Sequence, residues 1–385
     1  MPVELQYILI FALAMGVTLV LTPAAMWLGQ HYGVTSRPGG RHSLEGDQKR
    51  VSKLGGLALF GGFTAAVLAA QVLPVPRLDP NESTRLIGLL LGGTIIFAVG
   101  VLDDVFEFGP LPQFVGQSLA AVVAILCLIF IEYVNNPFTG QQTQNFPFVL
   151  TAAITFFWLV FMMNTMNFLD GLDGLAGGVT LIAGAMLFIN SAYRVIPAQT
   201  SVSFLPLALM GTCAAWLLFN FYPARIFMGG GAQYLGFTLG ALSIIGGAKM
   251  GTILLVLGLP LIDVVWQAVD RLRHGRSPFR GDRGHLHFRL LDKGFSQRQI
   301  VLGYYAFCLC FGALTLTTSS QFFKFVALGV LGVLVLGTFV VLTRRRYASP
   351  SDVVAVEAAG ASGTASLMDD DPDIEPPPST GVGGR

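Results

Sequence analysis

The chain has 385 residues, of which 53% are hydrophobic and only 12% are charged. That charged share is about half of what soluble domains carry, so a soluble fold of this size could not bury its apolar side chains. The net charge is +1, and we expect the protein to contact membrane lipids and no nucleic acid. The composition therefore predicts an integral membrane protein.

Eleven apolar runs are long enough to cross the hydrocarbon core of a bilayer as helices, which takes about 17 to 25 residues. They lie at residues 5–28, 54–73, 85–102, 114–134, 148–166, 175–194, 203–221, 234–248, 250–268, 299–318 and 322–342. These runs predict an all-α fold, a polytopic transmembrane helical bundle of about eleven spans within residues 1–347.

Basic residues are distributed unevenly between the two sides of this bundle. If the N-terminus is outside, the cytoplasmic connections contain 17 Lys and Arg residues and the outer connections contain five. Because cytoplasmic connections carry the excess of positive charge, the N-terminus is expected outside and the C-terminus in the cytoplasm. Residues 348–385 are rich in Ala, Gly, Ser, Pro and Asp, which predicts a disordered cytoplasmic tail.

Two adjacent carboxylates, Asp103 and Asp104, close the third apolar run at its predicted cytoplasmic end. They could be solvated acids, yet the C-terminus of a helix is the negative end of its dipole and does not favour them. Carboxylates at a membrane boundary are costly unless they meet cations, and such residues are functional candidates. We therefore expect Asp103 and Asp104 to belong to a site.

A second polar cluster, at the predicted cytoplasmic end of the fifth run, has a polar side chain every three residues. Its members are Asn164, Asn167, Asp170 and Asp173. Over a turn or two of helix these side chains would project from one side. A helix cap would need one such side chain, whereas four are present, so the cluster favours a functional site.

The connection at residues 271–298 is basic and contains His285, His287 and Arg289. It could set the topology and attract anionic lipid headgroups, or it could bind phosphate through Arg and His donors. The two interpretations are compatible. Asp263, in the ninth run, is the main charged residue away from the end of a run, and it could be a structural polar contact or a site residue.

A glycine turn at residues 229–231 follows Asn220. It could bring backbone N–H groups to a phosphate, or it could be a simple tight loop. Acids, amides, a glycine turn and a basic segment on one face of a membrane suggest a metal-assisted reaction on a phosphate. Mg²⁺, with Mn²⁺ as an alternative, is the expected cofactor, because it is a hard cation that carboxylates, water and phosphates hold.

Between about Arg41 and Ser296 the chain resembles the polyprenyl-phosphate N-acetylhexosamine-1-phosphate transferases. Asp103 and Asp104 look like the aspartate pair of this family, and residues 164–176 are similar to its NxxNFxDGxDGLA segment. Residues 53–56 resemble its KxGG segment, and residues 285–287 resemble its histidine motif. The chain has no longer histidine run, and in this respect it resembles the branch of the family that uses UDP-N-acetylglucosamine.

The resemblance implies a multi-pass enzyme of the bacterial inner (plasma) membrane that transfers a sugar 1-phosphate from a UDP-sugar to undecaprenyl phosphate and releases UMP. It implies that Asp103, Asp104 and Asp170 are catalytic, the first two by orienting or deprotonating the lipid phosphate. It also implies that Asp170 and Asp173 help to hold Mg²⁺ and the diphosphate. The residues expected to bind the substrates are Lys53, Asn164, Asn167, Asn220, His285, His287 and Arg289. The protein could also form a homodimer.

Three positions depart from the pattern of this family. The family usually has a lysine four residues before Gln117, and this chain has Gln113 there. The glycine turn of the family usually carries a metal-binding aspartate, and this chain has Gly230 at that position. Phe288 replaces a second adjacent histidine. Loss of a metal carboxylate removes transition-state stabilisation. The alternative to an active transferase is therefore a catalytically weakened homologue that binds lipid phosphate or nucleotide sugar in envelope assembly.

Overall fold

The computed structural model describes the whole chain except residues 37–49, 247–249, 274, 276–283, 319 and 345–385. Its described residues form helices and three isolated β-bridges, which confirms the predicted all-α fold. The chain divides into a unit at Met1–Leu336 and a second unit at Gly337–Arg385. The predicted tail at 348–385 lies outside the described residues.

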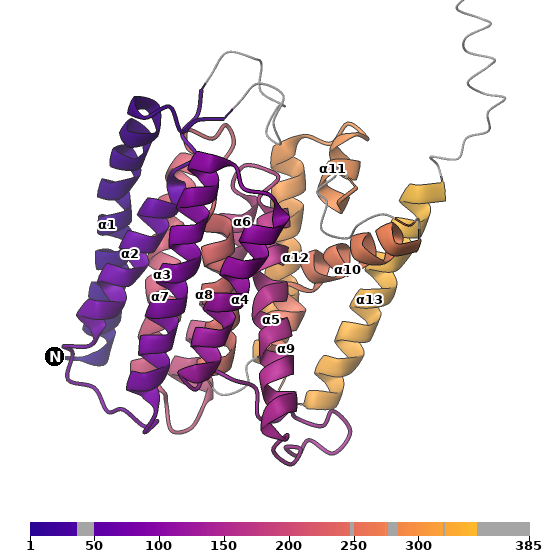
Figure 1. Ribbon diagram of the computed structural model, residues 1–385. Helices are drawn as coiled ribbons and strands as arrows, with labels where there is room; N and C mark the ends of the chain where they lie inside the picture. The colour runs from indigo at the N-terminus through magenta and orange to yellow at the C-terminus, as the bar shows by residue number, and fades with distance from the viewer. Residues whose placement is uncertain (37–49, 247–249, 274, 276–283, 319, 345–385) are drawn as a thin grey trace, which may run out of the picture. The chain divides into compact units, whose positions relative to one another are not determined.

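Thirteen α-helices and one π-helical turn make up the described part of the chain (Figure 1). They are α1 (Val3–His31), α2 (Gly55–Ala70), α3 (Glu82–Phe106), α4 (Pro110–Leu126), α5 (Phe148–Leu169), α6 (Leu175–Ile189), η1 (Asn190–Arg194), α7 (Thr200–Asn220), α8 (Gly231–Ile245), α9 (Met250–Val256), α10 (Gly258–Arg273), α11 (Leu286–Leu291), α12 (Gln297–Thr317) and α13 (Gln321–Arg344).

Seven helical segments in the described chain are long and apolar enough to cross a membrane, and the bent pair α9 and α10 would make an eighth. Three shorter apolar helices, α2, α4 and α8, lie in three further predicted runs. The protein is therefore a multi-pass membrane protein. The count of eleven spans and the sides on which the termini lie stay predictions.

Two predicted runs differ from the structure. The ninth, expected as one helix over 250–268, is bent by 77° between α9 and α10. Pro260 explains the break, because its ring nitrogen cannot donate to the carbonyl one turn earlier and so cannot continue α9. The fourth run, expected to extend to residue 134, ends its helix at Leu126, and Leu128 adopts a left-handed conformation with φ of 64°.

Helix packing in the bundle depends on small residues and on internally satisfied hydroxyls. α1 packs against α2 and α7, α5 against α8, and α3 against α4 and α8. Gly236 of α8 lies against the backbone of Met162 and Met163 in α5, an approach that a side chain at position 236 would prevent. Thr18 and Thr155 donate to carbonyls four residues earlier, so their buried hydroxyls need no other partner.

One end of the bundle gathers the ends of many helices, and we call it the site end. It contains the C-terminal ends of α3, α5 and α7 and the N-terminal ends of α2, α4, α6, α8 and α12, together with α11 (Figure 1). The N-terminus of α12 is fixed by a capping box, in which Ser296 accepts from the Gln299 N–H and the Gln299 side chain accepts from the Ser296 N–H.

Candidate functional site

A chain of side-chain hydrogen bonds crosses the site end between α5 and α3, and we call it the amide chain. Asn164 donates to Gln117 at 2.8 Å, Gln117 donates to Gln233 at 3.3 Å, Gln233 donates to Gln113 at 3.2 Å, and Gln113 donates to an Asp103 oxygen at 3.0 Å. These side chains come from α5, α4, α8 and α3. The structure therefore links two predicted site residues, Asp103 and Asn164, through three glutamines.

Asp104 faces the glycine turn. Its Oδ2 accepts from the Gly230 N–H at 3.0 Å, while the Gly231 N–H donates to the Met228 carbonyl. These two amides of the turn are therefore used by acceptors of the protein itself. The backbone of Gly230 lies against Gly100 of α3, and a Cβ at either position would overlap the other residue. The turn can approach Asp104 because both positions are glycine.

The turn between α5 and α6 is tied to the loop that follows α7. Asp173 is 5% exposed, and its Oδ2 accepts from the Ala224 N–H at 3.0 Å. Asn220 is 2% exposed; it accepts from the Gly174 N–H at 3.0 Å and donates to the Ile226 carbonyl at 2.9 Å. These bonds fix the α5–α6 turn, and the metal-binding role of Asp173 and the substrate-binding role of Asn220 stay predictions.

The other predicted residues of the second cluster lie beside this turn. Helix α5 ends at Leu169 and Asp170 is its C-cap, so the helix carries Asn164 and Asn167 but not Asp173. Asn167 and Asp170 are half-buried. Gly171 and Gly174 form the turn that follows α5, Gly174 with φ of 81°.

Lys53 lies just before α2 and forms an ion pair with Glu107 at 3.4 Å, at the C-cap of α3. Its backbone N–H donates to the Val34 carbonyl, and the carbonyl of its neighbour Ser52 accepts from Phe227. The KxGG segment thus lies between the end of α3 and the glycine turn. Its position beside Asp103 and Asp104 was not visible from the spacing alone.

Helix α10 turns its polar side chains inward. Asp263, Gln267 and Arg271, spaced four residues apart, are 3%, 2% and 4% exposed, whereas the apolar Val265 and Leu272 are 50% and 62% exposed. In a membrane protein such an inverted pattern directs polar groups toward the protein interior and apolar groups toward lipid. The inward face of α10 meets the segment that begins α11.

Asp263 and His285 form a buried pair, and with His287 and Phe168 they make what we call the histidine corner. One Asp263 oxygen lies 3.1 Å from His285 Nδ1 and the other accepts from the Leu286 N–H at 3.1 Å. The His285 ring stacks on Phe168 of α5 with centroids 5.0 Å apart. Of the two interpretations left open for Asp263, the structure supports at least the polar contact.

His287 is 1% exposed, and neither ring nitrogen has a hydrogen-bond partner in the described structure. Burial lowers the pKa of His287 to about 3, an effect that His285 reinforces and Asp263 opposes. His287 is therefore neutral near pH 7. A Cβ placed on Gly171 would lie 2.6 Å from His287 Nε2, so this histidine lies against the α5–α6 turn next to Asp170.

Arg289 is half-buried and donates to the Gly284 carbonyl at 2.6 Å, and Gln267 donates to the same carbonyl. These bonds fix the entry to α11. Part of the basic connection, residues 274 and 276–283, lies outside the described structure. The predicted phosphate contacts of His285, His287 and Arg289 stay predictions.

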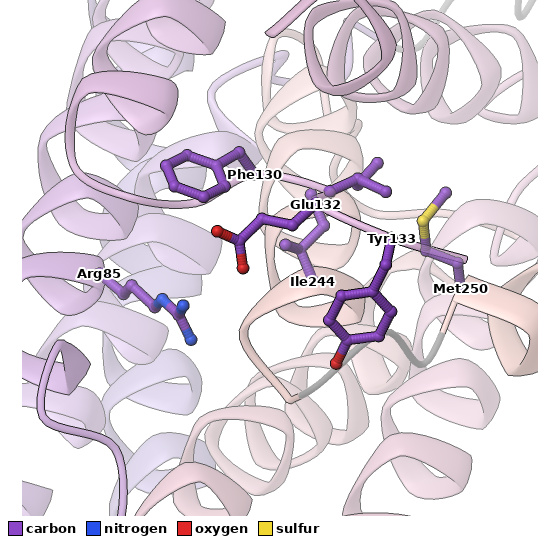
Figure 2. A pocket seen from close by; sticks show the side chains of 7 residues that line it. Arg85, Phe130, Glu132, Tyr133, Ile244 and Met250 are labelled. Carbon is purple, nitrogen blue, oxygen red and sulfur yellow. The ribbon is translucent and has the colours of Figure 1, made fainter. Parts of the chain in front are cut away.

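A separate hollow lies near the opposite end of the bundle (Figure 2). It encloses about 410 Å³, including its open mouth, and is lined by Arg85, Phe130, Ile131, Glu132, Tyr133, Ile244 and Met250. Figure 2 shows the Glu132 carboxylate turned toward Arg85, while Arg85 pairs with Asp79 at 2.7 Å. The rise per residue of α3 puts Arg85 about 27 Å from Asp103, so this hollow is not part of the site end.

Taken together, the predicted acids lie at one end of the bundle, as the sequence indicated. Asp103 and Asp104 contact α4 and the glycine turn, and Asp173 contacts the loop that leads to that turn. Sequence reasoning did not identify Gln117 and Gln233 as members of a chain of hydrogen bonds. A signal was present, because an amide inside an apolar run must find a hydrogen-bond partner within the protein.

Comparisons with known proteins identify relatives of this chain. A model of glycosyl transferase family 4 matches residues 86–247. The chain is 33% identical to a decaprenyl-phosphate N-acetylglucosaminephosphotransferase of Mycobacterium leprae, over 76% of this chain and 80% of that protein. It is 27% identical to a probable undecaprenyl-phosphate N-acetylglucosaminyl 1-phosphate transferase of Bacillus subtilis, over 78% and 82% of the two chains.

A third relative is the undecaprenyl-phosphate alpha-N-acetylglucosaminyl 1-phosphate transferase of Yersinia pestis, 28% identical over 78% of this chain and 79% of that protein. The fold is that of a multi-pass membrane protein, and the matching family and relatives are transferases. The chain belongs to the polyprenyl-phosphate N-acetylglucosamine-1-phosphate transferases of glycosyl transferase family 4. This confirms the family that the motifs indicated.

Proposed function

We propose that this protein transfers N-acetylglucosamine 1-phosphate from UDP-N-acetylglucosamine to undecaprenyl phosphate, at the cytoplasmic face of a bacterial inner membrane. The observation that carries the proposal is the gathering of carboxylates from α3 and the α5–α6 turn, amides from α4, α5 and α8, and histidines from α11 at one end of the bundle. The names of the relatives specify a polyprenyl phosphate and the N-acetylglucosamine phosphate group.

In the proposed reaction an oxygen of the lipid phosphate attacks the β-phosphorus of the nucleotide sugar. A new P–O bond forms while the bond from the β-phosphorus to the bridging oxygen breaks, and UMP leaves with that oxygen. Positioning and charge neutralisation supply most of the catalysis in such transfers, and a lipid phosphate is already ionised at neutral pH. Asp103 and Asp104 would orient the acceptor, and His285 would contact the diphosphate of the donor.

The donor atoms at the site end suit Mg²⁺ in kind, because they are carboxylate and amide oxygens. In the part of the chain that is described, no three His, Cys, Asp or Glu side chains form a ready-made metal site. Mg²⁺ commonly needs only one or two carboxylates, with water and substrate phosphates completing its shell. Asp170 and Asp173 would hold it, and the bound ion would supply positive charge beside the diphosphate.

The test is transfer of radiolabel from UDP-N-acetylglucosamine to undecaprenyl phosphate by the purified protein with Mg²⁺. We expect a labelled lipid diphosphate product and an equal amount of UMP. A panel of other UDP-sugars defines the donor, and omission of Mg²⁺ or its replacement by Mn²⁺ defines the cofactor. Failure to form a lipid product from any UDP-sugar would refute the proposal.

A second candidate function is binding of the lipid phosphate or the nucleotide sugar without transfer. The specific observation in its favour is that Gly230, where the family pattern has a metal-binding aspartate, has no room for a side chain against Gly100. Binding of each substrate, measured by its stabilisation of the purified protein against heat, separates this candidate from an inactive protein. Binding without product would favour it.

A further inference from the structure

The amide chain has a fixed direction. The Gln113 NH₂ group donates to Asp103 Oδ2, so the carbonyl of Gln113 points away from Asp103. The carbonyl of Gln113 is then free only to accept, and Gln233 must donate to it. The same reasoning runs through Gln117, because a reversed amide anywhere would bring two donors or two acceptors together.

The direction reaches Asn164 at the far end. One hydrogen bond of its NH₂ group goes to Gln117 at 2.8 Å, and another goes to the Val160 carbonyl at 2.8 Å. Both N–H bonds are therefore used, and only the carbonyl oxygen of Asn164 is left to meet a substrate. A phosphate at neutral pH offers no hydrogen-bond donor to such an oxygen, whereas a sugar hydroxyl or an amide N–H does.

The middle of the chain is buried. Gln117 and Gln233 are 2% and 3% exposed, and each is fixed by a partner on both sides. Water cannot readily replace a lost link at such depth, so the loss of one amide leaves its neighbours without partners. Gln113 is one of the three departures from the family pattern, and the structure pairs it with Gln233.

We infer that Gln113, Gln117 and Gln233 are positioning residues that couple Asp103 to Asn164 through one directed chain of hydrogen bonds. The coupling makes Asn164 a hydrogen-bond acceptor for a hydroxyl or N–H group of the nucleotide sugar. This inference rests on the proposed transfer for its kinetic test and on the hydrogen bonds alone for its second test.

The kinetic test compares Gln113→Met with Gln113→Lys. Methionine loses both bonds of Gln113, whereas lysine can still donate to Asp103 but cannot accept from Gln233. If the amide chain positions Asn164, both variants should lower kcat about tenfold. A combination of either variant with Gln233→Met should lower kcat no further. Wild-type kcat in Gln113→Lys, or losses that multiply in the combined variant, would overturn the inference.

A matched control is Gln6→Met. Gln6 is a 2% exposed glutamine of α1 that donates to the Met1 carbonyl and lies outside the amide chain. We expect its kcat to stay within about twofold of the wild type, because it contacts neither Asp103 nor Asn164. A tenfold loss in this variant would show that removal of any buried amide impairs transfer, and it would overturn the specific role of the chain.

The second test needs no transfer. Asp103→Asn replaces the carboxyl acceptor of Gln113 at one end of the chain with an amide, and Asn164→Ala removes the donor to Gln117 at the other end. The shifts in unfolding temperature caused by Asp103→Asn and Asn164→Ala should be non-additive in the wild type and additive in the presence of Gln233→Met. Additive shifts in both backgrounds would overturn the inference. If the wild-type protein makes no lipid product, the proposed function fails, and this measurement still decides the coupling.

Discussion

The amide chain and the histidine corner hold a carboxylate in different ways. Asp103 is half-buried and receives a neutral amide, Gln113, whereas Asp263 is 3% exposed and pairs with the imidazole ring of His285. The histidine corner also contains the buried His287, whose pKa is lowered to about 3 by burial. The stability that the histidine corner provides should therefore depend on pH.

The two regions meet at the α5–α6 turn, and the largest effect is expected there. Asp173→Asn removes the charge assigned to Mg²⁺ but keeps an oxygen that can accept from the Ala224 N–H. We expect transfer to fall by about 10²- to 10³-fold while the unfolding temperature changes little. Radiolabel transfer and thermal unfolding of the purified variant check this result, and a fully active variant would remove the metal assignment.

The protein should lose more stability when Asp263 of the histidine corner is truncated than when Asp103 of the amide chain is truncated. Asp263→Ala leaves the Leu286 N–H and His285 Nδ1 buried without an acceptor, which costs about 2–4 kcal/mol. Asp263→Asn is the matched control, since it retains an acceptor for Leu286 and should cost less. Chemical or thermal unfolding in detergent measures both. Equal stability of Asp263→Ala and the wild type would show that the pair is not a structural link.

The glycine contact beside Asp104 gives the next effect. Gly230→Ala places a methyl group against Gly100, and overpacking of this kind costs about 1–3 kcal/mol. Gly303→Ala in α12 is the control, because a Cβ there would meet no atom within 4 Å. We expect a lower unfolding temperature for the first variant and an unchanged or higher one for the second. A stable, more active Gly230→Asp variant would contradict the close contact.

Hydropathy and charge predicted much of this architecture. Eleven apolar runs each contain a helix, and the acids at the ends of α3 and α5 lie at the same end of the bundle. The bend between α9 and α10 was missed because hydropathy averages over a window, although Pro260 marked it. The three-residue spacing at residues 164–173 suggested a turn or two of helix, and in the structure α5 carries Asn164 and Asn167 and ends at Leu169.

The contacts between distant segments could not be predicted from spacing. Gln113 and Gln233 are 120 positions apart in the chain, and their pairing depends on how α4 packs beside α8. The sequence alone showed no partner for Asp263, because His285 lies 22 positions later, within the basic connection. The spacing of Asp263, Gln267 and Arg271 did carry a signal, since polar residues at intervals of four define one face of a helix.

The smallest expected effect tests the pH sensitivity of the histidine corner. The pKa of His287 is lowered to about 3 by burial, so between pH 6.5 and 3 the unfolded chain binds a proton at this residue that the folded chain does not. The contribution of His287 to the free energy of unfolding should therefore fall as the pH decreases through this window, by about 1.4 kcal/mol at pH 5.5. Unfolding temperatures measured from pH 8 to 5 check this slope.

The matched variants separate His287 from the other titrating groups. His287→Gln should flatten the slope, whereas His31→Gln should retain it, because His31 is exposed at the end of α1. If His287→Gln keeps the wild-type slope, the acid sensitivity comes from another part of the protein, and the contrast between the two regions does not hold.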